Sequence, residues 1–426
     1  MSEKPDYLHF DPETCRLRLD PHEPLFFQDP YPAYSYLHQV SPAFFWEEFG
    51  FWCFTGFDDV SKLLRDRSFG RENPEGPPVP QPQGSPRGHL AEFDAVEQHS
   101  LLEREPPVHT RLRTLVNRAF VSRQVERLRP KLEALSHQLI DGFEKQRSID
   151  LISAFATPLP VAIIADMLGI PQAMGPQLLD WSHRMVAMYM HGRSRDDELS
   201  ANSAAKAFAD YVRRQPAERR VRPGEDLLSL LAAAEADGDR LSEAELVSTA
   251  ILLLNAGHEA TVHQAGNAIK AILLNGGDAA EMFRDDTASA AAVEEALRFD
   301  APLHMFTRFC GPGVTFLAEL PFLSDRAGNK PILKTGDKIG LMLGAANRDP
   351  TAFDAPDRFM PARVDQKNVS FGAGIHFCIG APLARLELQV SLHILFERLP
   401  GLRLAEAPKY RDSYHFHGLE RLDVVW

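Results

Sequence analysis

The stretch of this chain with the clearest chemical content is residues 370–380, Ser-Phe-Gly-Ala-Gly-Ile-His-Phe-Cys-Ile-Gly. Its two glycines, Gly372 and Gly374, allow a loop to adopt positive φ and to press its backbone against a flat partner. Cys378 directly precedes an apolar, helix-forming segment, where free N–H groups and the helix dipole favour a thiolate. A buried thiolate needs a cation, and iron is an obvious one. The alternative is a buried structural cysteine beside a glycine-rich turn.

The full pattern is more specific than the cysteine alone. The order Phe371-Gly-x-Gly-x-His376-x-Cys378-x-Gly380 resembles the haem-binding loop of the cytochromes P450, the haem-thiolate monooxygenases. Residues 106–113, 256–259, 295–298 and 345–350 resemble other motifs of that family, in the expected order. The resemblance spans nearly the whole chain and is closest to soluble bacterial members. It implies a haem b cofactor with Cys378 as the axial ligand of the iron.

The resemblance also implies partners for the rest of the cofactor. Phe371 and Gly372 belong to the loop that covers the haem. Haem carries two propionates, which need cationic or donor partners when they are buried. The family positions that supply them are occupied by His109, Arg113, Arg308 and His376. For any one of these side chains taken alone, the alternative is a solvated surface charge.

One long helix must position the opposite side of such a site. Ser242 and Glu245 have the spacing of a capping box, and apolar residues continue to Leu274, before Asn275 and two glycines. A helix of about nine turns that is apolar on most sides should cross the middle of the molecule, over the haem. Helical periodicity is also found over 110–131, 131–144, 151–167, 171–190, 200–214, 293–299 and 379–399, strand-like runs over 51–55, 314–317 and 338–343, and an irregular, proline-rich stretch over 72–88.

Composition sets the broader class. The 426 residues include 46 Lys+Arg and 59 Asp+Glu, a net charge of −13, and 44% are hydrophobic, as in ordinary globular proteins. The acidic balance argues against a nucleic-acid partner. Four scattered cysteines, no signal-peptide pattern and no apolar run of membrane-spanning length predict a cytoplasmic protein without a membrane anchor. We expect one domain over residues 1–426, mainly α with a minor β-sheet, in the cytochrome P450 fold. Whether residues 1–20 form a flexible N-terminal segment stays open.

The central helix departs from the family at the oxygen-activating motif. The resemblance assigns this catalytic region to Gly257, Glu259, Ala260 and Thr261, but the family has a threonine where Ala260 stands. That hydroxyl helps to organise a water for proton delivery, and Thr261 is rotated by about 100° around the helix. Three explanations stay open. A substrate polar group or an ordered water replaces the hydroxyl while Glu259 supplies protons, local unwinding brings Thr261 or His258 into range, or electrons are lost to peroxide.

The substrate pocket is predicted from family position. It should include Leu102, Met188, Leu303, His304, Phe306 and Phe416. Methionine and phenylalanine provide an adaptable apolar surface, and His304 could place a polar or anionic end of the substrate. For about half of the apolar positions in this region, the alternative is a plain core role.

A basic stretch suggests a partner. Against one acid, Glu126, the segment from His109 to Lys131 contains seven basic residues: Arg111, Arg113, Arg118, Arg123, Arg127, Arg129 and Lys131. The chain has no Gly-x-Gly-x-x-Gly nucleotide motif, so electrons should come from a separate ferredoxin or flavodoxin, steered to this basic proximal face. The alternative is an ordinary solvated helix face.

Together these features predict a monooxygenase. It would insert one oxygen atom of O₂ into a small-to-medium organic molecule, by hydroxylation or by oxidative demethylation. A peroxide-driven or reductive haem-thiolate enzyme is the second hypothesis, which Ala260 makes more credible. A haem-thiolate ligand sensor is a third, non-enzymatic one.

Overall fold

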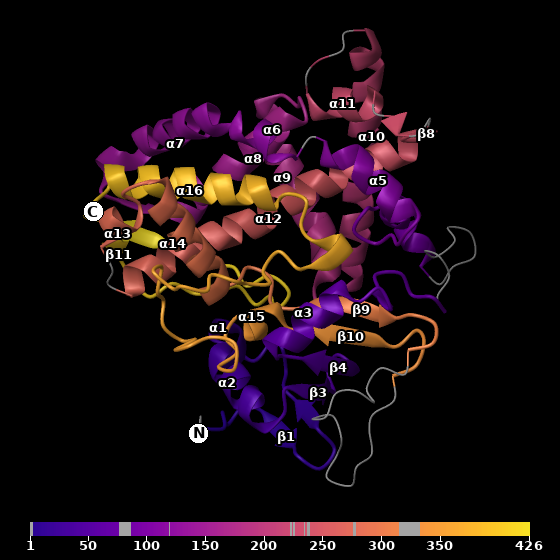
Figure 1. The fold of residues 1–426 in the computed structure, drawn as a ribbon. Coiled ribbons are helices and arrows are strands. Elements are labelled where there is room, and N and C mark those ends of the chain that lie inside the picture. The colour runs from indigo at the N-terminus through magenta and orange to yellow at the C-terminus, as the bar shows by residue number, and fades with distance from the viewer. Residues whose placement is uncertain are drawn as a thin grey trace.

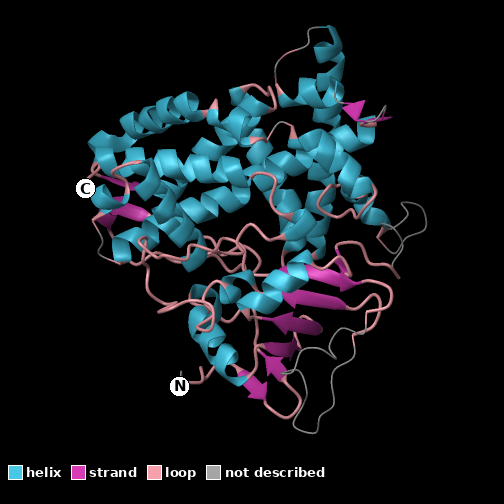
Figure 2. Ribbon diagram, in the orientation of Figure 1, coloured by secondary structure: helices cyan, strands magenta, loops and turns pink. Residues whose placement is uncertain are grey.

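Helices form most of the molecule and a β-sheet forms one end of it (Figures 1 and 2). The computed structural model describes residues 3–75, 87–118, 120–221, 224, 226–233, 235–236, 239–275, 278–314 and 333–426. The N-terminus lies near the sheet, whereas the C-terminus lies at the helical end (Figure 1). The predicted fold class, mainly α with a minor sheet, is confirmed. None of the helices in the described part of the chain has the length and hydropathy that crossing a bilayer requires.

The helices follow one another along the chain with short connections. They are α1 (Pro24–Gln28), α2 (Tyr31–Val40), α3 (Phe57–Arg65), α4 (Ala91–Glu97), α5 (Val108–Asn117), α6 (Ser122–Glu126), α7 (Arg129–Phe143), α8 (Pro158–Met167), α9 (Gly175–Val186), α10 (Arg195–Val221), α11 (Leu227–Ala233), α12 (Glu243–Leu274), α13 (Ala279–Met282), α14 (Asp286–Phe299), α15 (Leu343–Ala346) and α16 (Ala381–Arg398). Shorter turns of 3₁₀ or π helix are η1 (Gly88–Leu90), η2 (Glu144–Gln146), η3 (Ile152–Ala156), η4 (Gln172–Met174), η5 (Ala187–Tyr189) and η7 (Gly374–His376).

The main sheet combines strands from both ends of the chain. Its order within the described residues is β1-β2-β3-β4-β10-β9-β5, in which the pairs β2–β3 and β4–β10 are parallel and the others antiparallel. These strands are β1 (His9–Asp11), β2 (Arg16–Arg18), β3 (Ala43–Trp46), β4 (Phe51–Phe54), β5 (Phe69–Gly70), β9 (Phe306–Cys310) and β10 (Lys338–Leu341). A smaller sheet has the order β11-β12-β6, from β6 (Ser148–Asp150), β11 (Arg403–Leu404) and β12 (Asp423–Val425), and β7 (Glu235–Ala236) pairs with β8 (Asp239–Arg240).

The long helix α12 crosses the helical part of the molecule, as predicted (Figure 1). The capping box is present, because the Ser242 hydroxyl accepts from the Glu245 N–H and the Glu245 carboxylate accepts from the Ser242 N–H. Helices α8, α9, α10, α14 and α16 all pack against α12. A Cβ at Gly257 would lie 3.3 Å from Ile164 of α8, so this glycine lets the two helices approach closely.

Three expectations need correction or fall outside the described residues. The single helix over 110–131 is wrong: α5 ends at Asn117, Val121 is extended, and Pro130, which lacks an N–H, lies in the first turn of α7. Residues 1–20 are not a flexible segment throughout, because β1 and β2 join the sheet and Leu17 is buried. The expected strand over 314–317 is outside the described residues beyond Val314, as is the irregular stretch over 76–86.

A buried ion pair connects α14 to the segment that precedes the 370–380 loop. Glu295 and Arg298, each 1% exposed, form a two-bond pair with N–O distances of 2.8 Å, as their spacing predicted. The guanidinium also donates to the carbonyl oxygens of Asn347 and Pro356, both at 2.9 Å, and Glu295 accepts from the Met360 N–H at 2.7 Å. The pair therefore has enough additional partners to offset the desolvation of two charges.

We expect Arg298→Ala to destabilise the fold strongly. It leaves the Glu295 carboxylate buried with much of its compensation removed, which should cost about 3–5 kcal/mol of the free energy of unfolding. Denaturant titration of the variant measures this. The matched control is Arg284→Ala, which removes an i,i+3 pair with Glu281 whose side chains are 61% and 67% exposed, and should change stability little. Equal losses in the two variants would contradict a special role for the buried pair.

Candidate active site

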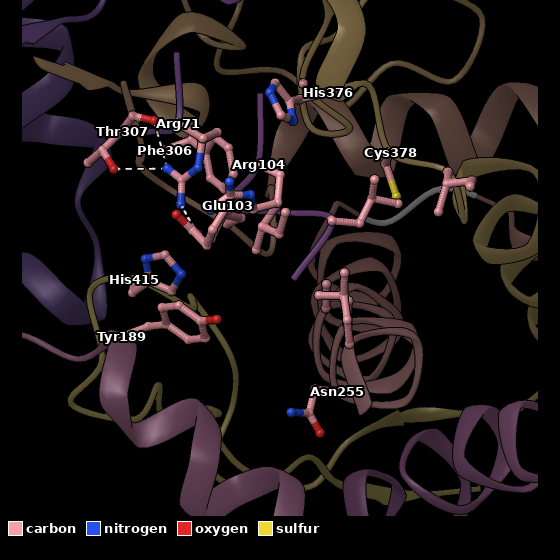
Figure 3. Close-up of a pocket in the computed structure, with 18 of the residues that line it drawn as sticks. Arg71, Glu103, Arg104, Tyr189, Asn255, Phe306, Thr307, His376, Cys378 and His415 are labelled. Atoms are coloured by element: carbon pink, nitrogen blue, oxygen red, sulfur yellow. Dashed lines mark hydrogen bonds and ion pairs between the residues drawn. The ribbon is translucent and has the colours of Figure 1, made fainter. Parts of the chain in front are cut away.

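A deep cavity of about 1250 Å³ lies between α12 and the 370–380 loop. Its walls also come from residues 101–109, from β9 and from the first turns of α16. Figure 3 shows Cys378 on one side of this space and Tyr189, His415 and Arg71 on another. The predicted residues that line the cavity are Leu102, His109, Arg113, Met188, Gly257, Glu259, Ala260, Thr261, Leu303, Phe306, Arg308, Phe371, Gly372, His376, Cys378 and Phe416. The volume exceeds that of ordinary ligand pockets, roughly 300–1,000 Å³, and leaves room for a flat cofactor together with a substrate.

The cysteine loop has the backbone geometry that its glycines predicted. Gly372 and Gly374 have φ values of +67° and +72°. A Cβ at Gly374 would lie 2.5 Å from the carbonyl oxygen of Leu64 at the end of α3, so no other residue fits there. The Cys378 N–H donates to the Phe371 carbonyl at 2.9 Å, which closes the loop directly before α16. The sulfur is thereby held at the helix start, open to the cavity.

The surroundings of the sulfur favour a metal ligand over a free thiolate. Burial raises the pKa of the Cys378 thiol, although the N–H groups of Gly380 and Ala381 and the charge of Arg113 act in the opposite direction. The helix start alone therefore does not hold the anion, contrary to what the dipole argument suggested. A bound cation would supply what is missing.

Basic side chains gather on the same side of the cavity. Arg308, 1% exposed, has no acidic partner within ion-pair distance among the described residues, and burial and Arg71 lower its pKa to about 9. Burial, His376 and Arg113 lower the pKa of His109 to about 4, and its Nε2 atom has no hydrogen-bond partner. Arg113 donates to the Phe377 carbonyl at 2.6 Å.

One acid reaches this basic group. The His376 Nε2 atom lies 2.8 Å from Glu105, so this histidine already has a carboxylate partner. Hydrogen bonds from His376 and from the Arg71 N–H overcome burial and lower the pKa of Glu105. Arg308 and the orphaned His109 nitrogen remain without a carboxylate. The cavity therefore fits a flat, metal-bearing ring with two carboxylates, which is the description of haem.

On the opposite wall, α12 is helical throughout residues 243–274. Local unwinding near Gly257 is therefore not found. Thr261 lines the cavity nonetheless, with its hydroxyl 3.3 Å from the Gly257 carbonyl that it donates to. His258 points away from the cavity, since its Nδ1 donates to the Leu254 carbonyl at 2.8 Å.

Glu259 is almost fully buried and is surrounded by histidines. Its carboxylate oxygens lie 3.1 Å from His183, 3.6 Å from His258 and 3.3 Å from His263, measured to the Nε2 atoms. Burial would raise the pKa of the Glu259 carboxyl, but these three imidazoles hold it far below its usual range. The carboxylate also borders the cavity, so it separates the cavity from a histidine cluster behind α12.

The far end of the cavity contains polar groups that the sequence did not single out. Arg71 is held by the Thr307 carbonyl and hydroxyl, at 2.7 and 3.0 Å, and by an ion pair with Glu103 (Figure 3). Its guanidinium lies over the Phe306 ring at 4.4 Å. Asn255 of α12 lines the same space. No motif marks these residues, because their side chains meet only through the fold.

The expected role of His304 in the pocket is wrong. Its ring is fully buried, and its Nδ1 atom lies 2.7 Å from the Tyr34 hydroxyl, within an aromatic group that includes Tyr414 and His417. Its neighbour Leu303, which bridges to Phe416 through the backbone, does line the cavity. The chain is extended here, so adjacent side chains turn to opposite sides.

The basic face is smaller than the sequence predicted. Three of its seven basic residues meet acids from other helices: Arg111 with Glu245, Arg129 with Asp286, and Lys131 with Asp166. Arg118, Arg123 and Arg127 are exposed. They lie on or next to α5 and α6, and α6 packs against α16, the helix that begins behind Cys378.

Comparison with known proteins gives consistent matches. Residues 290–401 match the family described as Cytochrome P450. Cytochrome P450 107B1 of Saccharopolyspora erythraea is 35% identical, over 88% of each chain. The polyketide biosynthesis cytochrome P450 PksS of Bacillus subtilis is 34% identical, over 96% of this chain and 98% of its own. The solved structure of P450BioI in complex with acyl carrier protein ligated to hexadec-9Z-enoic acid superposes with a TM-score of 0.84 at 31% identity, covering 94% of this chain and all of the other.

Replacing Arg308 with leucine should affect the empty and the loaded protein in opposite directions. The apoprotein should become more stable, because a buried charge without an acidic partner is removed. Haem loss to an excess of a haem-scavenging protein should become about tenfold faster or more, since a hydrogen bond to a charged group contributes about 1.5–3 kcal/mol. An unchanged rate of haem loss would show that Arg308 does not hold a carboxylate of the cofactor.

Proposed function

This chain belongs to the cytochrome P450 family of haem monooxygenases, and from that premise we propose which reaction it performs and which residues perform it. The proposed reaction inserts one oxygen atom of O₂ into a small-to-medium organic substrate, by hydroxylation or by oxidative demethylation. The observation that carries the proposal is one cavity with the Cys378 sulfur on one wall and residues 256–261 of α12 on the other.

The proposed cofactor site is made by the loop and the basic side chains. Cys378 ligates the haem iron, and Phe371 and Gly372 lie against the ring. Arg308, Arg113 and His109 donate to the propionates, with His376 shared between a propionate and Glu105. When bound, haem supplies the activation of O₂ and the transfer of its oxygen atom to the substrate.

The shape and polarity of the cavity suggest the kind of substrate. Leu102, Met188, Leu303, Phe306 and Phe416 form apolar walls. At the far end, the charge of Arg71 is balanced by Glu103, while the Arg71 Nε and the Asn255 Oδ1 atoms have no hydrogen-bond partner.

Burial raises the pKa of the nearby Glu97 carboxyl to about 8, so this group is largely neutral at pH 7. The polar end thus offers donors and acceptors with little net charge. We propose a mainly apolar substrate that carries neutral oxygen groups such as hydroxyl or carbonyl. The relative named for polyketide biosynthesis is compatible with that class.

Proton delivery must work without a hydroxyl at Ala260. The intact helix leaves two of the sequence hypotheses. In the first, a substrate hydroxyl or an ordered water takes the missing position, and Glu259 supplies protons from the histidine side of α12. In the second, electrons are lost to peroxide. Because the cavity carries polar groups for an oxygen-bearing substrate, we favour the first.

Ala260 also supports a second candidate function, a peroxide-driven enzyme that bypasses proton delivery. The two differ in a simple assay. Turnover with hydrogen peroxide alone at a rate equal to the NAD(P)H-driven one would favour the peroxide-driven reaction. A ligand sensor would show neither.

Coupling tests the role of Ala260. In the wild-type protein, product formed per NAD(P)H consumed should fall several-fold when a substrate hydroxyl is replaced by hydrogen, because the missing oxygen is no longer supplied. Ala260→Thr should restore coupling with the deoxy substrate and change it little with the parent one. Equal coupling for both substrates in the wild-type protein would contradict substrate assistance.

The proposed redox partner is an acidic ferredoxin or flavodoxin. Reversing the exposed charges in Arg118→Glu, Arg123→Glu and Arg127→Glu together should slow reduction by such a partner at low ionic strength by about tenfold or more. Stopped-flow reduction measures this, and the salt dependence should weaken in parallel. The control reverses Arg18, Arg213 and Arg421, which lie on other elements. Equal effects of the two triple variants would contradict docking at α5 and α6.

A further inference from the structure

The histidine cluster behind α12 has the composition of a metal site. His183 of α9 and His258 of α12 place their Nε2 atoms 3.1 and 3.6 Å from the same oxygen, Oε1 of Glu259. The three ligand atoms all lie within 4.8 Å of one another. His263 approaches the other carboxylate oxygen, Oε2, at 3.3 Å. Two nitrogens and one oxygen therefore converge while the fourth group orients the carboxylate.

His258 indicates that a cation belongs there. Its Nδ1 faces a carbonyl oxygen, which only accepts, so this nitrogen carries a proton and the neutral ring has a lone pair on Nε2. The side chain is 1% exposed, and Nε2 has no hydrogen-bond partner. A lone pair and a carboxylate oxygen face each other here, which is unfavourable unless a positive charge lies between them. A carbonyl on the far nitrogen is also the usual arrangement of a metal-binding histidine.

The distances agree with one cation in particular. Ligand atoms about 2.0–2.1 Å from a tetrahedral zinc ion stand roughly 3.3 Å apart, between the two observed separations. Imidazole and carboxylate together suit zinc and its neighbours, whereas magnesium and calcium prefer oxygen ligands throughout. We propose that His183, His258 and Glu259 bind a divalent cation of the zinc class, with His263 positioning the carboxylate and a water as the fourth ligand.

Access distinguishes this cluster from another one in the molecule. The His183 side chain is 46% exposed, so a cation can enter from solvent while the other two ligands are buried. The similar group Asp300, His304 and His417 is buried throughout. Asp300 already accepts from the Tyr31 hydroxyl at 2.8 Å and from Lys270 at 3.3 Å, so its charge is compensated.

Metal binding would have a consequence for catalysis, and this step rests on the proposed function. The carboxylate that binds the cation is the one that borders the cavity and is proposed to supply protons. A cation on Oε1 occupies the lone pair that would take up a proton. Bound zinc should therefore lower the product formed per NAD(P)H consumed, and a chelator should restore it.

Calorimetric titration of Zn²⁺ into the haem-loaded protein tests the site directly. We expect one site that His183→Ala weakens by at least about tenfold, while Mg²⁺ gives no binding. The matched control is His393→Ala on α16, because His393 is 44% exposed and lies 4.0 Å from Glu397 but has no third ligand. Wild-type binding no tighter than that of His183→Ala would overturn the proposal, as would an equal loss in His393→Ala.

Thermal unfolding provides a second readout that does not depend on activity. Zn²⁺ should raise the midpoint of the wild-type and His393→Ala proteins, but not that of His183→Ala. Coupling is then measured with and without Zn²⁺. If zinc binds through His183 and coupling is unchanged, the metal site stands and the proton role of Glu259 is wrong. If zinc does not bind, the metal site is wrong whatever the turnover.

Discussion

The position of one sulfur atom is the constraint on which the site depends. Cys378 is held by a loop that is fixed on two sides. Gly374 presses against the Leu64 carbonyl, where a Cβ would lie 2.5 Å from the oxygen, and the Ser370 hydroxyl donates to the Leu297 carbonyl of α14 at 2.7 Å. Asn347 donates to Ser370, and the same segment is bound by the buried Arg298. A metal–ligand bond tolerates displacements of a few tenths of an ångström, so this support is a condition of the chemistry.

Charge balance is the second organising feature. On the loop side of the cavity, positive groups outnumber acids, and Arg308 stays buried without an acidic partner. On the other side of α12, a single carboxylate is surrounded by three imidazoles, two of them buried. Desolvated charges are costly unless they are compensated, so each imbalance indicates the sign of what binds there, carboxylates in the first case and a cation in the second.

The sequence predicted the parts of the fold that depend on local patterns. The capping box and the apolar run located α12, and the glycine spacing located the positive-φ loop, because both signals lie within one segment. The helix over 110–131 was wrong because apolar periodicity continues across an extended Val121. His304 and Arg71 could not be placed, since the partners that orient them, Tyr34 and Glu103, are distant in the sequence. The histidines around Glu259 were missed for the same reason, as His183 comes from another helix.

The pairing of β4 with β10 has a consequence for the order in which the protein can fold. Trp52 is the strand partner of Ile339, and β9 and β10 separate β4 from β5 in the sheet. During translation the first strands therefore emerge with unsatisfied edges, and the chain that completes them follows only after the whole helical part has been made. At roughly 5–20 residues per second this interval is some tens of seconds. A nascent chain in that condition is a natural client for chaperones, and its yield should depend on how long those early strands are protected.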